Sequence, residues 1–142
     1  MEQDKSQLIG SWQLLSAQLE MADTKERLDL LGPSPVGRSI FTRDGRMATV
    51  LTASGRTAAV DVPSTAALFG SMMAYSGTFR FEEGAKVVLS CDTAWNPAWV
   101  GTEQVRFYEF NGDRLTLRTN RLSHPSHPGR EVYGIIEWKR EH

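Results

Sequence analysis

The stretch that decides the fold runs from Thr102 to Arg121 and reads TEQVRFYEFNGDRLTLRTNR. It holds two segments of strand-like composition on either side of Asn111-Gly112-Asp113. This turn sequence is a strong signal for a tight β-hairpin, because Asn, Gly and Asp tolerate the positive φ angles that such turns require. The stretch therefore predicts a strand over residues 102–110 and a returning strand over residues 114–121.

The same alternation of strand and turn extends outward in both directions. Asp44-Gly45 and Glu83-Gly84 mark further hairpin turns. Strands are predicted over residues 11–18, 37–42, 46–52, 75–82, 86–93 and 130–139, with loops over 22–35, 53–63 and 123–129. Such regular spacing is typical of an antiparallel sandwich or barrel. We expect an all-β fold, an eight-stranded antiparallel up-and-down β-barrel, whose interior has room for side chains or for one small ligand.

Two helices are predicted beside the strands. Residues 4–9 can form one or two helical turns with Asp4 as the N-cap, and Gly10 ends them. Ser64 is a plausible N-cap for a second helix, whose apolar residues lie at helical spacing: Ala66, Ala67, Leu68, Phe69, Met72 and Met73. We expect this internal helix to plug or cover one end of the barrel, where Met73 can contact a ligand.

Length and composition exclude several classes of protein. The chain has 142 residues, 16 basic and 17 acidic, with a net charge of -1. This length predicts one domain over residues 1–142, and the balanced charge argues against a nucleic-acid partner. One cysteine and three histidines argue against a structural metal site, and Pro125 and Pro128 beside His124 and His127 exclude a helical ligand pair. We expect no cofactor. The polar N-terminus and the lack of a long apolar run predict a cytoplasmic protein without a membrane anchor.

Five segments, taken in order, carry a resemblance to a known family: Leu8–Trp12, Phe41–Met47, Tyr75–Phe79, Asn96–Arg106 and Gly112–Leu117. Together they resemble the bacterial and fungal lipocalin-like domain family, a set of small cytosolic β-barrels. The Gly10-Ser11-Trp12 opening and the Trp138-Lys139-Arg140 ending are similar to the lipocalin arrangement. That arrangement implies a basic residue that covers the Trp12 ring and closes one end of the barrel, through a cation–π contact.

The resemblance also implies a class of function. Some barrels of lipocalin type are cofactor-free cyclases of natural-product biosynthesis, so we expect a cyclase or isomerase that acts on a polyketide-like or aromatic apolar substrate. Many relatives carry a histidine in the strand that here reads Val87–Cys91, and this sequence has none there. Two alternatives are a non-catalytic carrier or sensor of a small hydrophobic ligand, and a dimerising interaction module with a filled barrel.

Strand alternation places the candidate chemistry on one face of residues 102–110. Gln104, Arg106, Tyr108 and Phe110 share that face, and the acidic Glu103 and Glu109 share the other. If the first face points inward, Arg106 is the polar anchor for an anionic or carbonyl group, because an uncompensated buried charge is costly. Arg106 and Tyr108 are then the candidate catalytic residues and Gln104 binds the ligand. The alternatives for Arg106 are a structural ion pair, with Glu103, Glu109 or Asp92, and a surface position.

The remaining candidate ligand-binding residues are aromatic or apolar. Trp95 and Trp99 share a loop between strands, and they either rim the cavity mouth or cap the core or a dimer contact. Tyr75 and Phe79 share one strand face, where the Tyr75 hydroxyl can donate to a bound carbonyl. Cys91 shares a face with Val87 and Leu89 and is expected to be a small buried apolar residue rather than a nucleophile.

Overall fold

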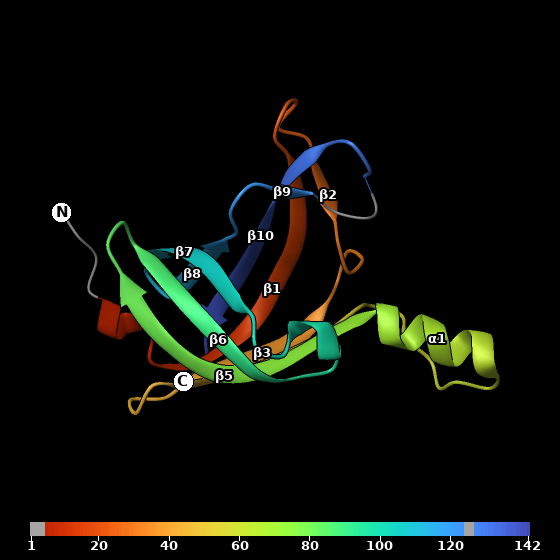
Figure 1. Cartoon of the computed structure of the whole chain (residues 1–142), viewed down its shortest axis with the longest axis horizontal. Coiled ribbons are helices and arrows are strands. Elements are labelled where there is room, and N and C mark those ends of the chain that lie inside the picture. The colour runs from red at the N-terminus through yellow and green to blue at the C-terminus, as the bar shows by residue number, and fades with distance from the viewer. Residues whose placement is uncertain (1–4, 124–126) are drawn as a thin grey trace.

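The strands of the computed structural model, which describes residues 5–123 and 127–142, follow one another around a single antiparallel sheet (Figure 1). The order is β2-β1-β3-β4-β5-β6-β7-β8-β10-β9, and pairing of β1 with β10 closes it. The strands are β1 Gly10–Met21, β2 Arg27–Asp29, β3 Val36–Phe41, β4 Arg46–Thr52, β5 Met72–Glu82, β6 Lys86–Ala94, β7 Glu103–Asn111, β8 Arg114–Arg118, β9 Leu122–Ser123 and β10 Glu131–Arg140. The predicted eight-stranded barrel is confirmed, with the short β2 and β9 added to the ends of β1 and β10.

The hairpin turns form where the sequence predicted them. Gly45 and Gly112 adopt positive φ angles of 91° and 60°, which a side chain with a Cβ rarely adopts. In the strands that these turns join, successive side chains alternate between the interior and the surface. In β4, Met47, Thr49 and Leu51 are buried and the residues between them are exposed. The predicted loop over residues 123–129 lies partly outside the described residues, and the predicted strand over 114–121 ends at Arg118.

One end of the barrel is closed by the N-terminal segment η1 (Lys5–Leu8) and by Arg140. The Arg140 guanidinium lies 4.2 Å from the ring centroid of the fully buried Trp12, and its Nη1 donates to the carbonyl oxygen of Ile9 at 3.0 Å. The Trp12 indole donates to the carbonyl oxygen of Leu8 at 2.9 Å. These contacts confirm the cation over Trp12 that the resemblance implied. The predicted N-cap Asp4 lies outside the described residues.

The internal helix differs from the prediction in bounds and in place. Helix α1 spans Val62–Gly70 and is capped by Asp61, whose carboxylate accepts from the backbone of Ser64 at 2.8 Å, so Ser64 is not the N-cap. Met72 and Met73 begin β5 instead of ending the helix. The expectation of a plug is also wrong, because no residue of α1 is buried and the helix projects away from the barrel (Figure 1).

No helix in the described ranges, 5–123 and 127–142, is long and apolar enough to cross a membrane.

Candidate functional site

A cavity of about 190 Å³ opens inside the barrel at the end opposite η1. Most of its wall is apolar, and a few polar side chains reach it from β1, from β7 and from Thr119 just after β8. The lining residues are Gln18, Leu19, Leu30, Met73, Trp99, Gln104, Arg106, Thr119, Leu122, Gly134 and Ile136. An apolar hollow with a few convergent polar groups is the usual form of a small-molecule site.

Arg106 is the charged group of this cavity. The residue is 5% exposed, and alternation along β7 buries it together with Tyr108 and Phe110 while Glu103 and Glu109 stay exposed. Its guanidinium donates from Nη1 to the carbonyl oxygen of Val105, at 2.9 Å. Within the described part of the chain, no carboxylate lies within ion-pair distance of it. The guanidinium is therefore buried and neutralised by no described acidic side chain.

The acidic residues proposed as partners for Arg106 are engaged elsewhere or face outward. Asp92 binds Arg46 at 2.7 Å, and Glu103 binds Arg80 at 2.7 Å, both on the outer surface. The Arg46 guanidinium holds the pKa of Asp92 below its ordinary value, and Arg80 does the same to the pKa of Glu103. Glu109 is exposed on the outer face of β7. The structure thus contradicts both alternatives for Arg106, the structural ion pair and the surface position.

Further polar groups share the cavity with Arg106. The Gln104 side-chain amide donates to the Thr102 hydroxyl at 2.9 Å, which fixes the amide near the mouth. The Thr119 hydroxyl donates to the carbonyl oxygen of Asn120 at 2.8 Å and accepts from the backbone of Gly134 at 2.8 Å. Both groups are therefore held in place by neighbouring protein atoms before any ligand enters.

Met73 and Trp99 provide apolar wall at the mouth. The short helix η2 (Pro97–Trp99) positions the Trp99 indole, with Asn96 as its N-cap. The Trp99 ring lies 5.1 Å from the ring of Tyr75 and 5.2 Å from the ring of Trp95. Four of the predicted site residues, Met73, Trp99, Gln104 and Arg106, are thus brought together around one cavity.

The other five predicted site residues lie outside the described lining of this cavity. Tyr75 is buried behind Trp99, and Trp95 lines a hollow on the outside of the barrel. Phe79 packs edge-on against Phe41 at 5.2 Å. Tyr108 points toward the η1 end, where its ring lies 5.8 Å from that of Phe81. A ligand-binding role for these residues stays a prediction.

Cys91 is also buried away from the described cavity wall. Burial raises the pKa of its thiol, an effect that outweighs the lowering by Thr102 and Arg106. A thiol with a raised pKa is a poor nucleophile near neutral pH, because the thiolate is the reactive form.

The sequence pattern does not predict most of the cavity wall from β1 and β10. The register between β1 and β10 shifts between Leu14 and Ser16, so a bulge moves the inward positions of β1 from Trp12 and Leu14 to Ala17 and Leu19. Strict alternation from Trp12 instead predicts that Ala17 and Leu19 face outward. Ile136 of β10 could have been found, because it follows the inward alternation of Trp138.

The comparisons with known proteins give one match. A family model described as a lipocalin-like domain matches residues 9–141. No curated protein matches the chain.

Proposed function

Since this chain belongs to the lipocalin-like domain family, we propose that its barrel binds one small, largely apolar molecule in the cavity beside Arg106. The single observation that carries the proposal is the buried Arg106 guanidinium, which no described carboxylate neutralises. A buried charge is costly unless it is compensated, so the cavity is suited to a ligand that brings an anionic or carbonyl oxygen. Gln104 can donate a second hydrogen bond to the same oxygen or to a neighbouring one.

The volume of the cavity sets the size of the proposed ligand. An engineered apolar cavity of about 150 Å³ in another protein holds one benzene molecule. A cavity of about 190 Å³ accordingly suits one aromatic ring, or an aliphatic chain of similar size, with one polar substituent. A larger, polyketide-like molecule would extend through the mouth past Met73 and Trp99.

The test is a comparison of benzoate, benzamide and toluene as probes, by calorimetric titration of the wild-type chain and of Arg106→Met. We expect benzoate to bind the wild-type chain best and to lose roughly 10- to 100-fold in affinity in the variant, because a hydrogen bond to a charged group contributes about 1.5–3 kcal/mol. Arg46→Met is the matched control, since it removes an exposed guanidinium far from the cavity. Equal binding of benzoate by the wild-type chain and Arg106→Met would refute the proposal.

The finer proposal is a cofactor-free cyclase or isomerase that acts within the same cavity. Its support is the pair Arg106 and Gln104, which can stabilise negative charge that develops on a carbonyl oxygen, as in an enolate. Among the described lining residues there is no carboxylate, imidazole or amine to accept a proton, so the proton would pass to water or to the substrate itself. This geometry favours binding more strongly than proton transfer.

A measurement of α-proton exchange distinguishes the enzyme hypothesis from the carrier or sensor hypothesis. We expect an enolising site to accelerate deuterium exchange at the α-carbon of phenylacetone, followed by proton NMR, and Arg106→Met to abolish the acceleration. An exchange rate equal to that of buffer, together with binding of the probe, supports the carrier or sensor.

A further inference from the structure

A patch on the outer surface of β3 to β5 is largely apolar and is bordered by the ion pair of Arg46 with Asp92. We define the wall as six outward residues that lie side by side on β3, β4 and β5 and just after β6: Ile40, Ala48, Val50, Ala74, Ser76 and Trp95. A hollow of about 340 Å³ crosses it between β4 and β6. Arg38 stands among these residues, but its guanidinium is bound to Glu141 at 3.0 Å. The outer faces of β7 and β10 carry charged residues such as Glu109 and Lys139 instead.

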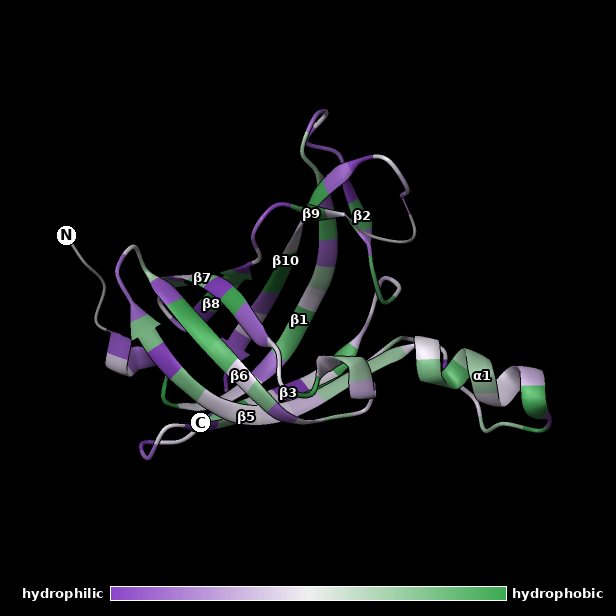
Figure 2. Cartoon of the chain, viewed as in Figure 1, coloured by the Kyte–Doolittle hydropathy of each residue, from purple (hydrophilic) through white to green (hydrophobic). Residues whose placement is uncertain are grey.

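The second feature is the arm, residues 57–70, which ends in helix α1 and contains a single charged residue, Asp61. Val60 and Val62 are 88% and 81% exposed, and Phe69 is 49% exposed. In Figure 2 the helix is mostly white or green, as expected for an apolar segment. A helix of nine residues with no buried side chain is not stable in water by itself, because helices this short depend on tertiary packing.

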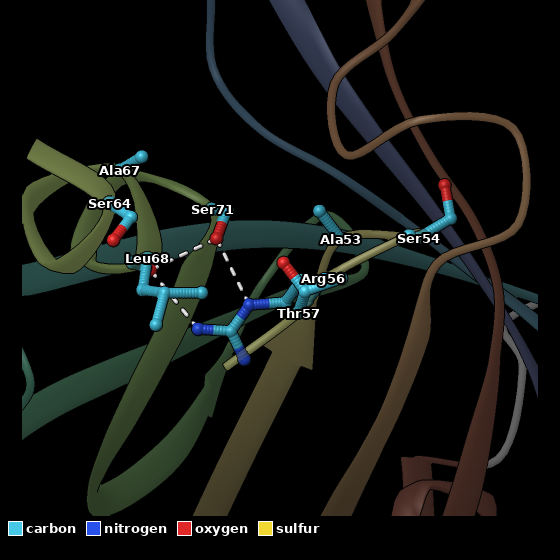
Figure 3. A pocket seen from close by; sticks show the side chains of 9 residues that line it. Ala53, Ser54, Arg56, Thr57, Ser64, Ala67, Leu68 and Ser71 are labelled. Atoms are coloured by element: carbon cyan, nitrogen blue, oxygen red, sulfur yellow. Dashed lines mark hydrogen bonds between the residues drawn. The ribbon is translucent and has the colours of Figure 1, made fainter. Parts of the chain in front are cut away.

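The base of the arm is fixed so that the helix points away from its own barrel. The single residue Ser71 joins the end of α1 to the start of β5. The Arg56 guanidinium donates to the Ser71 hydroxyl at 3.0 Å and to the carbonyl oxygen of Leu68 at 3.1 Å, as Figure 3 shows. Phe69 packs against Trp95 at 6.2 Å. The arm and the wall therefore meet at Trp95 and form one bent apolar surface.

We propose that the arm of one chain lies on the wall of a second copy, and that the second copy returns the same contact across a twofold axis. Each chain has one arm and one wall, so a single reciprocal exchange covers both surfaces of both chains and leaves neither open to further copies. The inference goes beyond the proposed function, because neither surface includes Arg106 or the described cavity.

Charge and size both favour a second copy as the occupant. The arm carries one charged residue, Asp61, and the six wall residues carry none, although Arg38, paired with Glu141, stands beside them. On β7 or β10 the arm would cover more charged groups, such as Glu109 or Lys139. The nine residues of α1 extend over about 14 Å at 1.5 Å per residue, and the four strands β3 to β6 also span about 14 Å. The arm and the wall offer at most fourteen and six residues, so each chain contributes up to 20, the lower end of the roughly 20–30 residues a side of stable interfaces.

The test is the molar mass of the full chain by light scattering at micromolar concentration. We expect about 32 kDa for the wild-type chain, twice the 15.9 kDa of one chain. Val62→Lys on the arm and Val50→Lys on the wall should each give the monomer mass with an unchanged barrel circular dichroism spectrum, because both side chains are exposed. Thr116→Lys, which adds the same charge on the outer face of β8, is the control and should remain a dimer.

Mixing the two variants tests which surfaces meet. A mixed dimer of Val62→Lys with Val50→Lys retains one undamaged pair, the arm of the second variant on the wall of the first. We expect the mixture to dimerise more strongly than either variant alone. A monomer mass for the wild-type chain, a dimer mass in either single variant, or a mixture without recovery would each overturn the proposal.

Discussion

The guanidinium of Arg140, near the C-terminus, lies 4.2 Å from the centre of the Trp12 ring at the start of the first strand. The same guanidinium donates to the carbonyl oxygens of Ile9 and Gln7. One side chain near the C-terminus thus contacts the N-terminal segment and closes one end of the barrel.

Arg140→Met should lower the free energy of unfolding by about 1–3 kcal/mol, because it removes the cation–π contact and the hydrogen bonds to the segment η1. Urea denaturation followed by Trp fluorescence measures the change. Lys139→Met is the control, since Lys139 is exposed on the same strand. Equal midpoints for the two variants would show that the Arg140 contact contributes nothing.

Arg106→Met should raise the free energy of unfolding of the ligand-free chain, by about 1–4 kcal/mol, because methionine fills the same space without a buried charge. If Arg106 instead stabilises the fold, the same substitution should lower the free energy of unfolding. Thermal and urea unfolding, measured without ligand, decide between the two. Combined with weaker benzoate binding, a more stable variant would identify Arg106 as a residue kept for binding at a cost in stability.

Gly77→Ala should destabilise the barrel by about 1–3 kcal/mol, because β5 and β6 approach each other closely at their bulge. A Cβ on Gly77 would come within 1.8 Å of the carbonyl oxygen of Ser90. Gly70→Ala is the matched control: a Cβ there meets nothing within 4 Å, so helix propensity predicts a small gain in stability. Urea unfolding of both variants measures the difference.

The acid stability of the barrel should depend on Glu20. Its ion pair with Arg118, at 2.9 Å, lowers the pKa of the Glu20 carboxyl from the ordinary value of 4.5. Because the folded-state pKa is below the unfolded one, the stabilisation is fully present above the unfolded pKa and is lost as the pH falls through the folded pKa. Glu20→Gln should therefore be less stable than the wild-type chain at pH 7, and the difference should shrink toward pH 3.

Free energies of unfolding between pH 3 and pH 7 measure this dependence. Glu83→Gln, in the exposed turn between β5 and β6, serves as the control. A constant difference between Glu20→Gln and the wild-type chain over that range would contradict the assignment.

Part of the site could be predicted because strand alternation is local. The alternation around Arg106 in β7 placed that side chain, with Gln104, on the inward face, and both line the cavity. Alternation also places Tyr108 on this face, yet Tyr108 lies toward the closed end, because two residues along a strand advance by almost 7 Å. The sequence thus predicted which side chains of β7 face inward, but not how far along the barrel axis each of them lies.

The internal helix shows the other limit of local patterns. Met72 and Met73 continue the apolar spacing of the helix, but strand pairing of Met72 with Thr52 and of Met73 with Leu51 includes them in β5. Backbone hydrogen bonds to β4 outweigh a weak helical preference at the end of a short helix.

The sequence by itself determined the hairpins, the number of barrel strands and the inward face of β7, because turn residues and a two-residue period act between near neighbours. Only the tertiary structure decided where the barrel is hollow, since a cavity is the volume that side chains from distant strands leave unfilled. It also decided that Arg106 lacks a described acidic partner and that the arm stands apart from the wall. The cavity depends on the closure of β1 on β10 and on the bulge between Leu14 and Ser16, which turns Ala17 and Leu19 of β1 inward.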